Sequence, residues 1–514
     1  MARPSRPRRR RGADRRTARA ASGRAPRPAV PVTVQQYGVL LDSLAHRHTG
    51  RHIEQVSWDW RGPLDTERFT CAWQSVMDRE AVLRAAVDWQ DDPRARPPGP
   101  RIVLHDHARA DVVRHRAGTV GWEELLERDR LRGFDLRRPA PLRLTLFDLP
   151  GQDTARPGGA PATRVLLTFH HALLDAWSAY VLLDEFGRAY LAGGVLPGGE
   201  RRPDIRDRAR WLERQDPAAA RDFFTRTAPP EPPVLLPALP GPGTGQSGCG
   251  RAEARLSAAE AARLHRWAGA RAVPDSGVLH AVWALLLYRA AGTDGPATVG
   301  FGVTASGRGI ALDAVERLVG PMRTHLPVTV RVDPAHRLEQ LLSALRDRAL
   351  DMAAYEWACA GQARQWAGRT AGPALLDSLV SLETVPGRPA ALRAGLSAAG
   401  IRFERLRASG AHTLFPVALL AHHLADGSLA LAALHDRARL ADADAARLVA
   451  HCARLLRHLP GTGPGATVAD ALAVLGAEPV PRAARARRRE RPARWLRPHS
   501  THGPPGVQAP PSER

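Results

Sequence analysis

The spacing of apolar positions changes sharply on either side of residue 170. Residues 165–169 form a short, mostly apolar segment after a turn-rich stretch, which predicts a buried strand. Over residues 177–190 apolar side chains recur at intervals of three and four, which predicts a helix with Asp175 as its N-cap. His170 and His171 stand at the end of the strand. Because successive side chains of an extended chain point to opposite sides, only one of these histidines is expected to face a cavity.

The pattern elsewhere along the chain mixes helices with strands. Helical periodicity predicts helices over residues 64–84 and 441–459, and a pair of helices over residues 256–291. Strands are predicted over residues 85–89, 101–107, 141–149 and 297–306. The strand at 141–149 and the strand that ends at the histidines are expected to belong to one sheet and to be joined by a Gly/Pro-rich turn. These alternating elements predict a mixed α/β protein with the histidine pair at a strand end.

A Pro/Gly-rich stretch over residues 228–248 divides the chain into two halves. Gly243, Gly245 and Gly248 in this stretch have the GxGxxG spacing of a dinucleotide-binding turn. No predicted strand precedes them and prolines crowd the segment, so the stretch is interpreted as a linker.

Charge is concentrated at the two ends of the 514-residue chain, whose net charge is +22. Residues 1–29 contain 11 Arg and 1 Asp, and residues 480–514 contain 9 Arg and 2 Glu, so the ends carry 10 + 7 = 17 of these charges. Such arginine-rich, Pro-punctuated segments are expected to be disordered. The region between them keeps a net charge of only about +5, which argues against nucleic-acid binding by the core.

Residue usage excludes several classes of function. The chain has no lysine, so a Walker A phosphate site and Schiff-base chemistry are excluded. The 4 cysteines are far apart, which favours a reducing compartment over a disulfide framework. No apolar stretch is long enough to span a membrane and no signal peptide is recognisable. We therefore expect a soluble cytoplasmic protein that does not bind membranes.

Six segments resemble, in order, the motifs of one family. HHALLDAWS, from His170, resembles the HHxxxDGxS signature of the condensation domains of nonribosomal peptide synthetases, which belong with chloramphenicol acetyltransferase and other carrier- or CoA-dependent acyltransferases. The other five are VTVQQYGVLLDSL, DREAVLRAAVDW, RARWLERQDPAAARDFF, the pair VGFGVTASGR and LVGPMRTHLPVTV, and LLDSLVSLETVP. Of these, RARWLERQDPAAARDFF is similar to a single helix of the family. The resemblance covers residues 30–475.

The resemblance implies an α/β (α+β) fold of two chloramphenicol acetyltransferase-like lobes in a V-shaped pseudo-dimer, with mixed sheets flanked by helices. We assign residues 1–28 to a disordered tail, 29–205 to the N-terminal lobe, 206–478 to the C-terminal lobe and 479–514 to a second disordered tail. Adenylation, carrier and thioesterase segments are not recognisable, which predicts a free-standing condensation protein.

The resemblance also assigns roles around the histidine pair. His171, the second histidine of the motif, is expected to contact the attacking nucleophile as general base or hydrogen-bond anchor, and His170 to be structural. The backbone N–H groups near Ala176, together with Trp177 and Ser178, are candidates for oxyanion stabilisation or for the tunnel wall, because they lie at the positive end of the predicted helix.

Asp175 is expected to be structural and to be held by an arginine, since a buried carboxylate must be paired. Two arginines could serve: Arg84, in the motif that begins at Asp78, and Arg308, in the SGR turn. We prefer Arg84, because the resemblance assigns it to the same lobe as His171.

The implied function is an acyltransferase that forms an amide or ester from a thioester carried on the phosphopantetheine of a partner carrier protein, acting in trans on a small-molecule acceptor. No bound cofactor is expected. Ala176, Thr324, Thr329 and the pair Thr384-Val385 depart from the family pattern. Two alternatives therefore stay open: a non-catalytic, carrier-binding relative and a CoA-dependent acyltransferase.

Other histidines are weaker candidates for metal or catalytic sites. His46, His48 and His52 have no carboxylate or cysteine at ligand spacing and are interpreted as solvated loop residues. His422 and His423 lack the spacing of the first pair and are interpreted as a strand end. No metal site is predicted.

Overall fold

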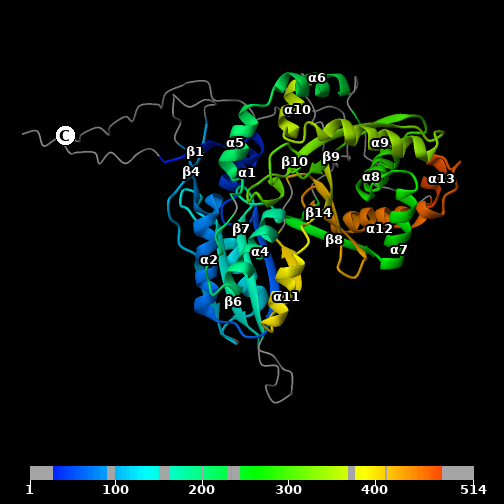
Figure 1. The fold of residues 1–514 in the computed structure, drawn as a ribbon. Coiled ribbons are helices and arrows are strands. Elements are labelled where there is room, and N and C mark those ends of the chain that lie inside the picture. Colours follow the sequence, from blue (N-terminus) through cyan, green and yellow to red (C-terminus); the bar gives the residue numbers. More distant parts are fainter. Residues whose placement is uncertain are drawn as a thin grey trace, which may run out of the picture.

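Local sequence patterns explain most of the observed elements in the computed structural model. The structure describes residues 27–89, 99–116, 118–149, 162–199, 201–228, 233, 244–367, 377–410 and 414–476. The predicted tails, apart from residues 27 and 28, and most of the linker, including Gly243, lie outside the described residues. The two lobes set at an angle to each other in Figure 1 confirm the predicted two-lobed fold of mixed sheets and helices.

The N-terminal lobe is built on a sheet with the strand order β12-β2-β7-β6-β5. These strands are β12 (Arg402–Ser409), β2 (Ile53–Arg61), β7 (Ala162–His170), β6 (Leu142–Asp148) and β5 (Asp111–His115). Helices α1 (Val34–Ala45), α2 (Thr66–Arg79), α3 (Trp122–Arg132) and α4 (Ala176–Leu191) accompany it. A small sheet is formed by β1 (Ala29–Pro31), β4 (Arg101–Leu104) and β3 (Ala85–Asp88). Strands β6 and β7 belong to one sheet, as predicted, and the structure shows that they pair antiparallel.

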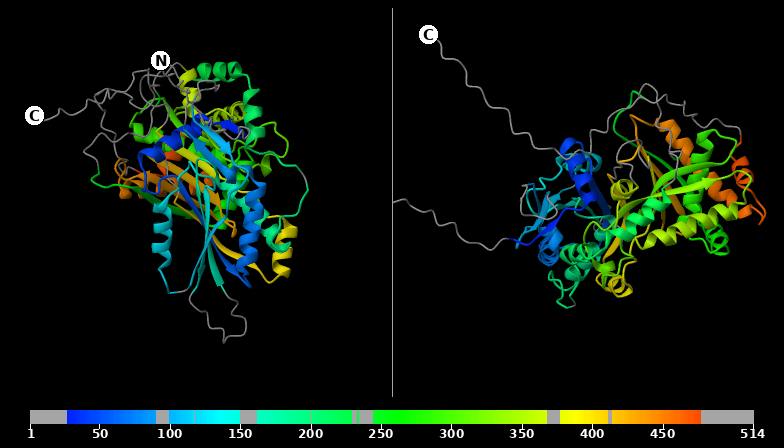
Figure 2. Two further views of the ribbon diagram at one scale, coloured as in Figure 1. Left: turned by 90° about the vertical axis from the view of Figure 1, so that its left-hand side faces the viewer. Right: turned by 90° about the horizontal axis from the view of Figure 1, so that it is seen from above.

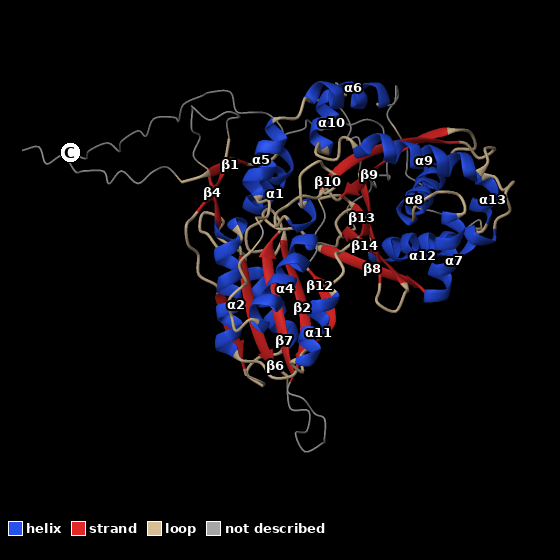
Figure 3. Ribbon diagram, in the orientation of Figure 1, coloured by secondary structure: helices blue, strands red, loops and turns tan. Residues whose placement is uncertain are grey.

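The C-terminal lobe contains a second sheet, in the order β10-β9-β11-β13-β14-β8 (Figure 3). Its strands are β10 (Thr324–Val332), β9 (Ala297–Ala305), β11 (Ser378–Glu383), β13 (Val417–His423), β14 (Leu429–Asp436) and β8 (Cys249–Leu256). Its helices are α7 (Ala258–Gly269), α8 (Asp275–Ala291), α9 (Leu338–Ala353), α10 (Ala360–Trp366), α12 (Asp442–His458) and α13 (Val468–Ala473). Helix α8 is buried on nearly all sides, as its apolar sequence predicts.

Two predicted helices are each divided in the structure. The helix expected over residues 208–224 is two helices, α5 (Ile205–Glu213) and α6 (Pro217–Thr227), because Asp216 caps α6 and Pro217 occupies its first turn. The helix expected over residues 64–84 ends as α2 at Arg79, and residues 81–84 form a short 3₁₀ helix.

A segment of the C-terminal half of the chain completes the N-terminal lobe. Strand β12 pairs antiparallel with β2, and α11 (Ala390–Ala398) packs on α4. Leu392, Leu396 and Ile401 belong to the same buried cluster as the N-terminal core. The assignment of all residues 206–478 to the C-terminal lobe is therefore wrong for residues 390–409. Figure 2 shows α11, in yellow, against the N-terminal lobe.

No helix in the described part of the chain combines the length and the hydropathy needed to cross a bilayer.

Candidate active site

The loop that follows β7 is held by hydrogen bonds at both ends. Strand β7 ends at His170, and the backbone N–H of His171 donates to the carbonyl of His52 at 2.9 Å, which ties the loop to β2. Asp175 caps α4, as predicted, by accepting from the backbone N–H of Ser178 at 2.8 Å. The motif therefore lies on a short connection between a buried strand and a buried helix, so its side chains have little freedom.

His170 is enclosed, with 2% of its surface exposed. The N–H of Ala172 donates to its Nδ1 at 3.1 Å, so the ring proton resides on Nε2, which donates to Ser43 Oγ at 3.1 Å. Burial lowers the pKa of His170 to about 3. A neutral, fully bonded ring of this kind fits a structural role.

His171 is the partly accessible member of the pair, with 26% of its side chain exposed. Its Nδ1 is buried and lies 3.1 Å from Oε1 of Glu54, although the angle between them is not that of a hydrogen bond. Glu54 stands on β2 directly opposite Phe169 of β7. His171 lines the cavity beside this loop, and of its two ring nitrogens only Nδ1 is fully buried without a partner.

That cavity has a volume of about 310 Å³ and is built from both lobes. A volume of this size lies at the lower end of small-molecule sites. The polar side chains that line it include His171, Gln35, Gln36, Arg208, Arg323, Thr324 and Gln362, and the apolar ones include Val30, Val32, Val39, Ile205, Leu212 and Trp357. Helix α1 bridges the lobes here, since Gln35 Nε2 donates to the carbonyl of Arg323 at 2.8 Å and Gln36 Nε2 donates to that of Ala172 at 2.9 Å.

Asp175 is paired with Arg308, and the preferred prediction of Arg84 is wrong. Arg308 donates to both carboxylate oxygens, at 2.9 and 3.2 Å, and the N–H of Met322 donates to Oδ2 at 3.0 Å. Gly307 shapes this turn at a φ of +67°, where a Cβ would collide with the carbonyl oxygen of Met322. Burial raises the pKa of Asp175, but attraction and hydrogen bonds from Arg308 outweigh it, and the net pKa is about 2.

Arg84 has a different role, at the end of α2. Its guanidinium donates to the carbonyls of Met77 at 2.6 Å, Asp78 at 2.5 Å and His105 at 3.1 Å. Carbonyls in the last turn of a helix have no partner within the helix, so Arg84 satisfies them. The ion pair of Asp175 instead crosses between the lobes, a contact that sequence adjacency could not indicate.

The candidates at the start of α4 lie beside the Asp175 ion pair and outside the cavity lining. Ser178 is fully buried, and its hydroxyl lies 2.7 Å from Asp175 Oδ1 and accepts from the N–H of Gly320 at 2.9 Å. Trp177 Nε1 donates to the carbonyl of Glu316 at 2.7 Å, and its ring lies beneath Arg308. The backbone N–H of Ser178 already donates to Asp175 and is not free to bind an oxyanion. A role of the other N–H groups near Ala176 in stabilising an oxyanion stays a prediction.

The prediction of solvated loop histidines is wrong for His52. Its ring is buried, and Nε2 lies 2.8 Å from Oδ2 of Asp42, which also pairs with His46 and Arg51. Asp42 belongs to α1, ten residues before His52, a separation that concealed the pair in the sequence. His423 ends β13, as expected. No cluster of metal-ligating side chains occurs in the described ranges.

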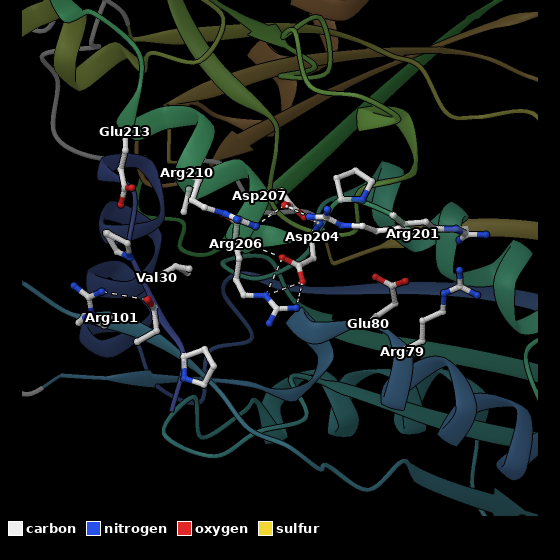
Figure 4. A pocket seen from close by; sticks show the side chains of 16 residues that line it. Val30, Arg79, Glu80, Arg101, Arg201, Asp204, Arg206, Asp207, Arg210 and Glu213 are labelled. Atoms are coloured by element: carbon white, nitrogen blue, oxygen red, sulfur yellow. Dashed lines mark hydrogen bonds and ion pairs between the residues drawn. The ribbon is translucent and has the colours of Figure 1, made fainter. Parts of the chain in front are cut away.

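A second, larger cavity of about 730 Å³ lies on the other side of α5 (Figure 4). Its arginines are largely engaged by neighbouring carboxylates: Arg206 pairs with Asp204, while Arg201 and Arg210 pair with Asp207 at 3.0 and 2.6 Å. This wall of compensated charges contains no histidine.

Comparison with known proteins places the chain among peptide synthetase domains. The sequence model of the condensation-domain family matches residues 27–460 of the chain. A linear gramicidin synthase protein of Brevibacillus parabrevis is 29% identical over 369 residues, which are 69% of this chain and 4% of that protein. Chondramide synthase of Chondromyces crocatus is 28% identical over 65% of this chain and 8% of its own length. The chain thus spans a small part of these relatives.

Solved structures show the same fold. The first condensation domain of the calcium-dependent antibiotic synthetase superposes with a TM-score of 0.65 at 18% identity, covering 86% of this chain and 98% of that one. The condensation domain of the monacolin K polyketide synthase superposes with a TM-score of 0.68 at 16% identity, covering 86% and 99%.

Proposed function

The chain belongs to the condensation-domain family, and on that premise we propose that it transfers an acyl group from a carrier-bound thioester to an amine or hydroxyl acceptor, with His171 at the reacting atoms. Condensation domains are acyltransferases that form amide bonds in nonribosomal peptide synthesis. The observation that carries the proposal is the accessible edge of His171 in a cavity that both lobes enclose.

The chemistry needs a base next to the nucleophile. The Glu54 carboxylate near Nδ1 favours the tautomer with a proton on Nδ1, which leaves the Nε2 lone pair toward the cavity. The acceptor nitrogen or oxygen forms a bond to the thioester carbon while its proton moves to Nε2. Glu54 then stabilises the imidazolium, as a carboxylate does in a catalytic triad.

Collapse of the tetrahedral intermediate breaks the C–S bond. The departing thiolate takes the proton from Nε2 and leaves as a thiol, so protons and electron pairs balance. The reaction replaces the thioester bond with an amide or ester bond, and this needs no external oxidant or metal. Glu54 was not identified from the sequence, because only the pairing of β2 with β7 brings it beside His171.

The partner that delivers the thioester is, in this proposal, a carrier protein with a phosphopantetheine arm. The apolar residues of the cavity would surround the acyl group and the polar ones the reacting centre. Delivery in trans, the use of CoA in place of a carrier protein, and a cytoplasmic location stay predictions of the sequence.

His171→Ala tests the proposal. We expect the rate of product formation from acyl-loaded carrier protein and an amine to fall by about a hundredfold to ten-thousandfold, because a positioned base is lost. The melting temperature should stay within a few degrees. His423→Ala is the matched control, since His423 is exposed at the end of β13 and outside the cavity.

A folded His171→Ala protein with the wild-type rate would refute the catalytic role. A wild-type protein that binds loaded carrier proteins and never releases product would instead support the non-catalytic alternative.

A further inference from the structure

Arg208 is a buried cation on the wall of the His171 cavity. It belongs to α5, only 9% of its surface is exposed, and it lines the cavity together with His171. Within the described residues its guanidinium makes no hydrogen bond or ion pair. Its guanidinium nitrogens are not among the fully buried side-chain atoms that lack a partner, so they reach the open space of the cavity. An arginine stays protonated, and its five N–H donors are therefore available there to an acceptor on a ligand.

Among the described residues, no carboxylate bonds directly to Arg208. Arg308 takes both oxygens of Asp175, and Arg323, on the same cavity, pairs with Glu383 at 2.7 Å. Burial lowers the pKa of Arg208 to about 10, while Asp175 attracts it and Arg308 repels it. The side chain therefore remains a cation near neutral pH. The carboxylate of α5 on this cavity, Glu213, is exposed and makes no ion pair with Arg208 among the described residues.

The opposite face of α5 provides an internal contrast. There Arg206 and Arg210 project toward the second cavity and are each bonded to a carboxylate, as the dashed lines in Figure 4 show. The same helix thus compensates the arginines on its exposed face and leaves the buried one open. An incoming anion can therefore offset the charge of Arg208.

We propose that Arg208 binds a carboxylate of the substrate, on the acyl group or on the acceptor. This inference rests on the proposed function and adds the substrate class: a molecule with a carboxylate at one end and an apolar body. The planar fork of a guanidinium suits two parallel bonds to a carboxylate. Ile205 and Leu212, on the same helix, and Val39 on α1 offer apolar contact to the remainder of the ligand.

Two pairs of probes distinguish the sources of the carboxylate. For the acyl side, the succinyl thioester of N-acetylcysteamine is compared with the neutral butyryl thioester, using butylamine as acceptor. For the acceptor side, leucine is compared with leucinamide, using the butyryl thioester. In one of the two pairs, wild-type protein should use the substrate with the carboxylate about ten- to a hundredfold better than its neutral counterpart, as measured by kcat/KM. Most of this difference should be in KM.

Arg208→Met should abolish that preference, and Arg208→Lys should restore part of it, because a point charge replaces the fork. Arg210→Met is the matched control on the exposed face of α5 and should keep the preference. Three results would overturn the inference. The wild-type protein could use both members of each pair equally, or its preference could persist in Arg208→Met. It could also select phosphopantetheine over pantetheine without selecting a carboxylate.

Thermal stability separates this role from a structural one and from failure of the proposed function. Arg208→Met should melt at or above the wild-type temperature, because it removes an uncompensated charge, whereas a lower melting temperature would assign Arg208 to the ion-pair network and overturn the inference. The carboxylate probe should also raise the melting temperature of wild-type protein and not of Arg208→Met. A rise in melting temperature with the carboxylate probe, without any product formation, would refute the proposed function alone. Product formation at equal rates from the carboxylate and neutral probes would refute the carboxylate site alone.

Discussion

Removal of the Asp175 carboxylate should destabilise the protein through the loss of one buried ion pair. Asp175 and Arg308 side chains are 2% and 6% exposed, so neither charge is well solvated. Asp175→Ala removes the two bonds from Arg308, the bond from Met322 N–H and the N-cap bond to Ser178. Breaking a buried pair costs about 3 to 5 kcal/mol. The uncompensated Arg208 nearby favours the upper end of that range.

The assay is urea unfolding at neutral pH, followed by tryptophan fluorescence, with Asp175→Ala, Arg308→Ala, Arg84→Ala and the two double variants. Coupling between Asp175 and Arg308 should reach about 2 to 3 kcal/mol, whereas Asp175 and Arg84 should be additive within about 0.5 kcal/mol. Wild-type stability should also fall as the pH drops from 3.8 toward 2, the interval over which Asp175 is ionised only in the folded state.

Two results would contradict this reasoning. A loss below about 1 kcal/mol in Asp175→Ala would mean that water or another cation replaces the pair, since typical surface pairs contribute no more than this. If Asp175 were coupled equally to Arg84 and to Arg308, the loss of stability would arise from changes spread through the lobe and not from the direct contact with Arg308.

The remaining predictions concern a titration and a strand. Burial raises the pKa of Glu80 from 4.5 to about 7, so its contribution to stability is full below pH 4.5 and is lost as the pH rises through 7; at about 1.4 kcal/mol per unit this amounts to about 3 kcal/mol. Glu80→Gln should therefore stabilise the protein at pH 8 and not at pH 4, in melting curves recorded at both values. Phe403→Ala should cost about 2 to 4 kcal/mol, because its ring lies 4.9 Å from that of Trp60 and holds β12 on β2. Glu404→Ala at a half-exposed position of β12 is its control, and a Phe403→Ala protein of unchanged stability would show that the strand is not held by this ring.

Elements with a local cause could be predicted from the sequence. The cap at Asp175, the helix after it and the pairing of β6 with β7 all follow from residues close together in the chain. The division between α5 and α6 was also readable, since Asp216 and Pro217 form a helix start that the prediction of one continuous helix overlooked.

Contacts between distant segments could not be predicted in the same way. Glu54 meets His171 through strand pairing, Arg308 meets Asp175 across the lobes, and β12 enters the N-terminal sheet after an excursion through the other lobe. Each depends on register or on lobe orientation, which local periodicity does not encode. Arg208 had no distinguishing signal, because it is one arginine among many until its burial and lack of a partner are known.

The Asp175 pair also affects where the catalytic loop stands. Asp175 lies four residues after His171, and its carboxylate accepts from Arg308 and from the Met322 N–H that precedes β10. Helix α1 fastens the same junction through Gln36 to Ala172, next to His171. Because the cavity is made by both lobes, a change in their separation alters the distance from His171 to Arg323 across it. An Asp175→Ala protein studied at a temperature where it remains folded should therefore show a raised KM as well as a lower kcat, since positioning errors of about 1 Å reduce rates by about a hundredfold. A variant that is less stable but kinetically normal when folded would restrict the ion pair to stability.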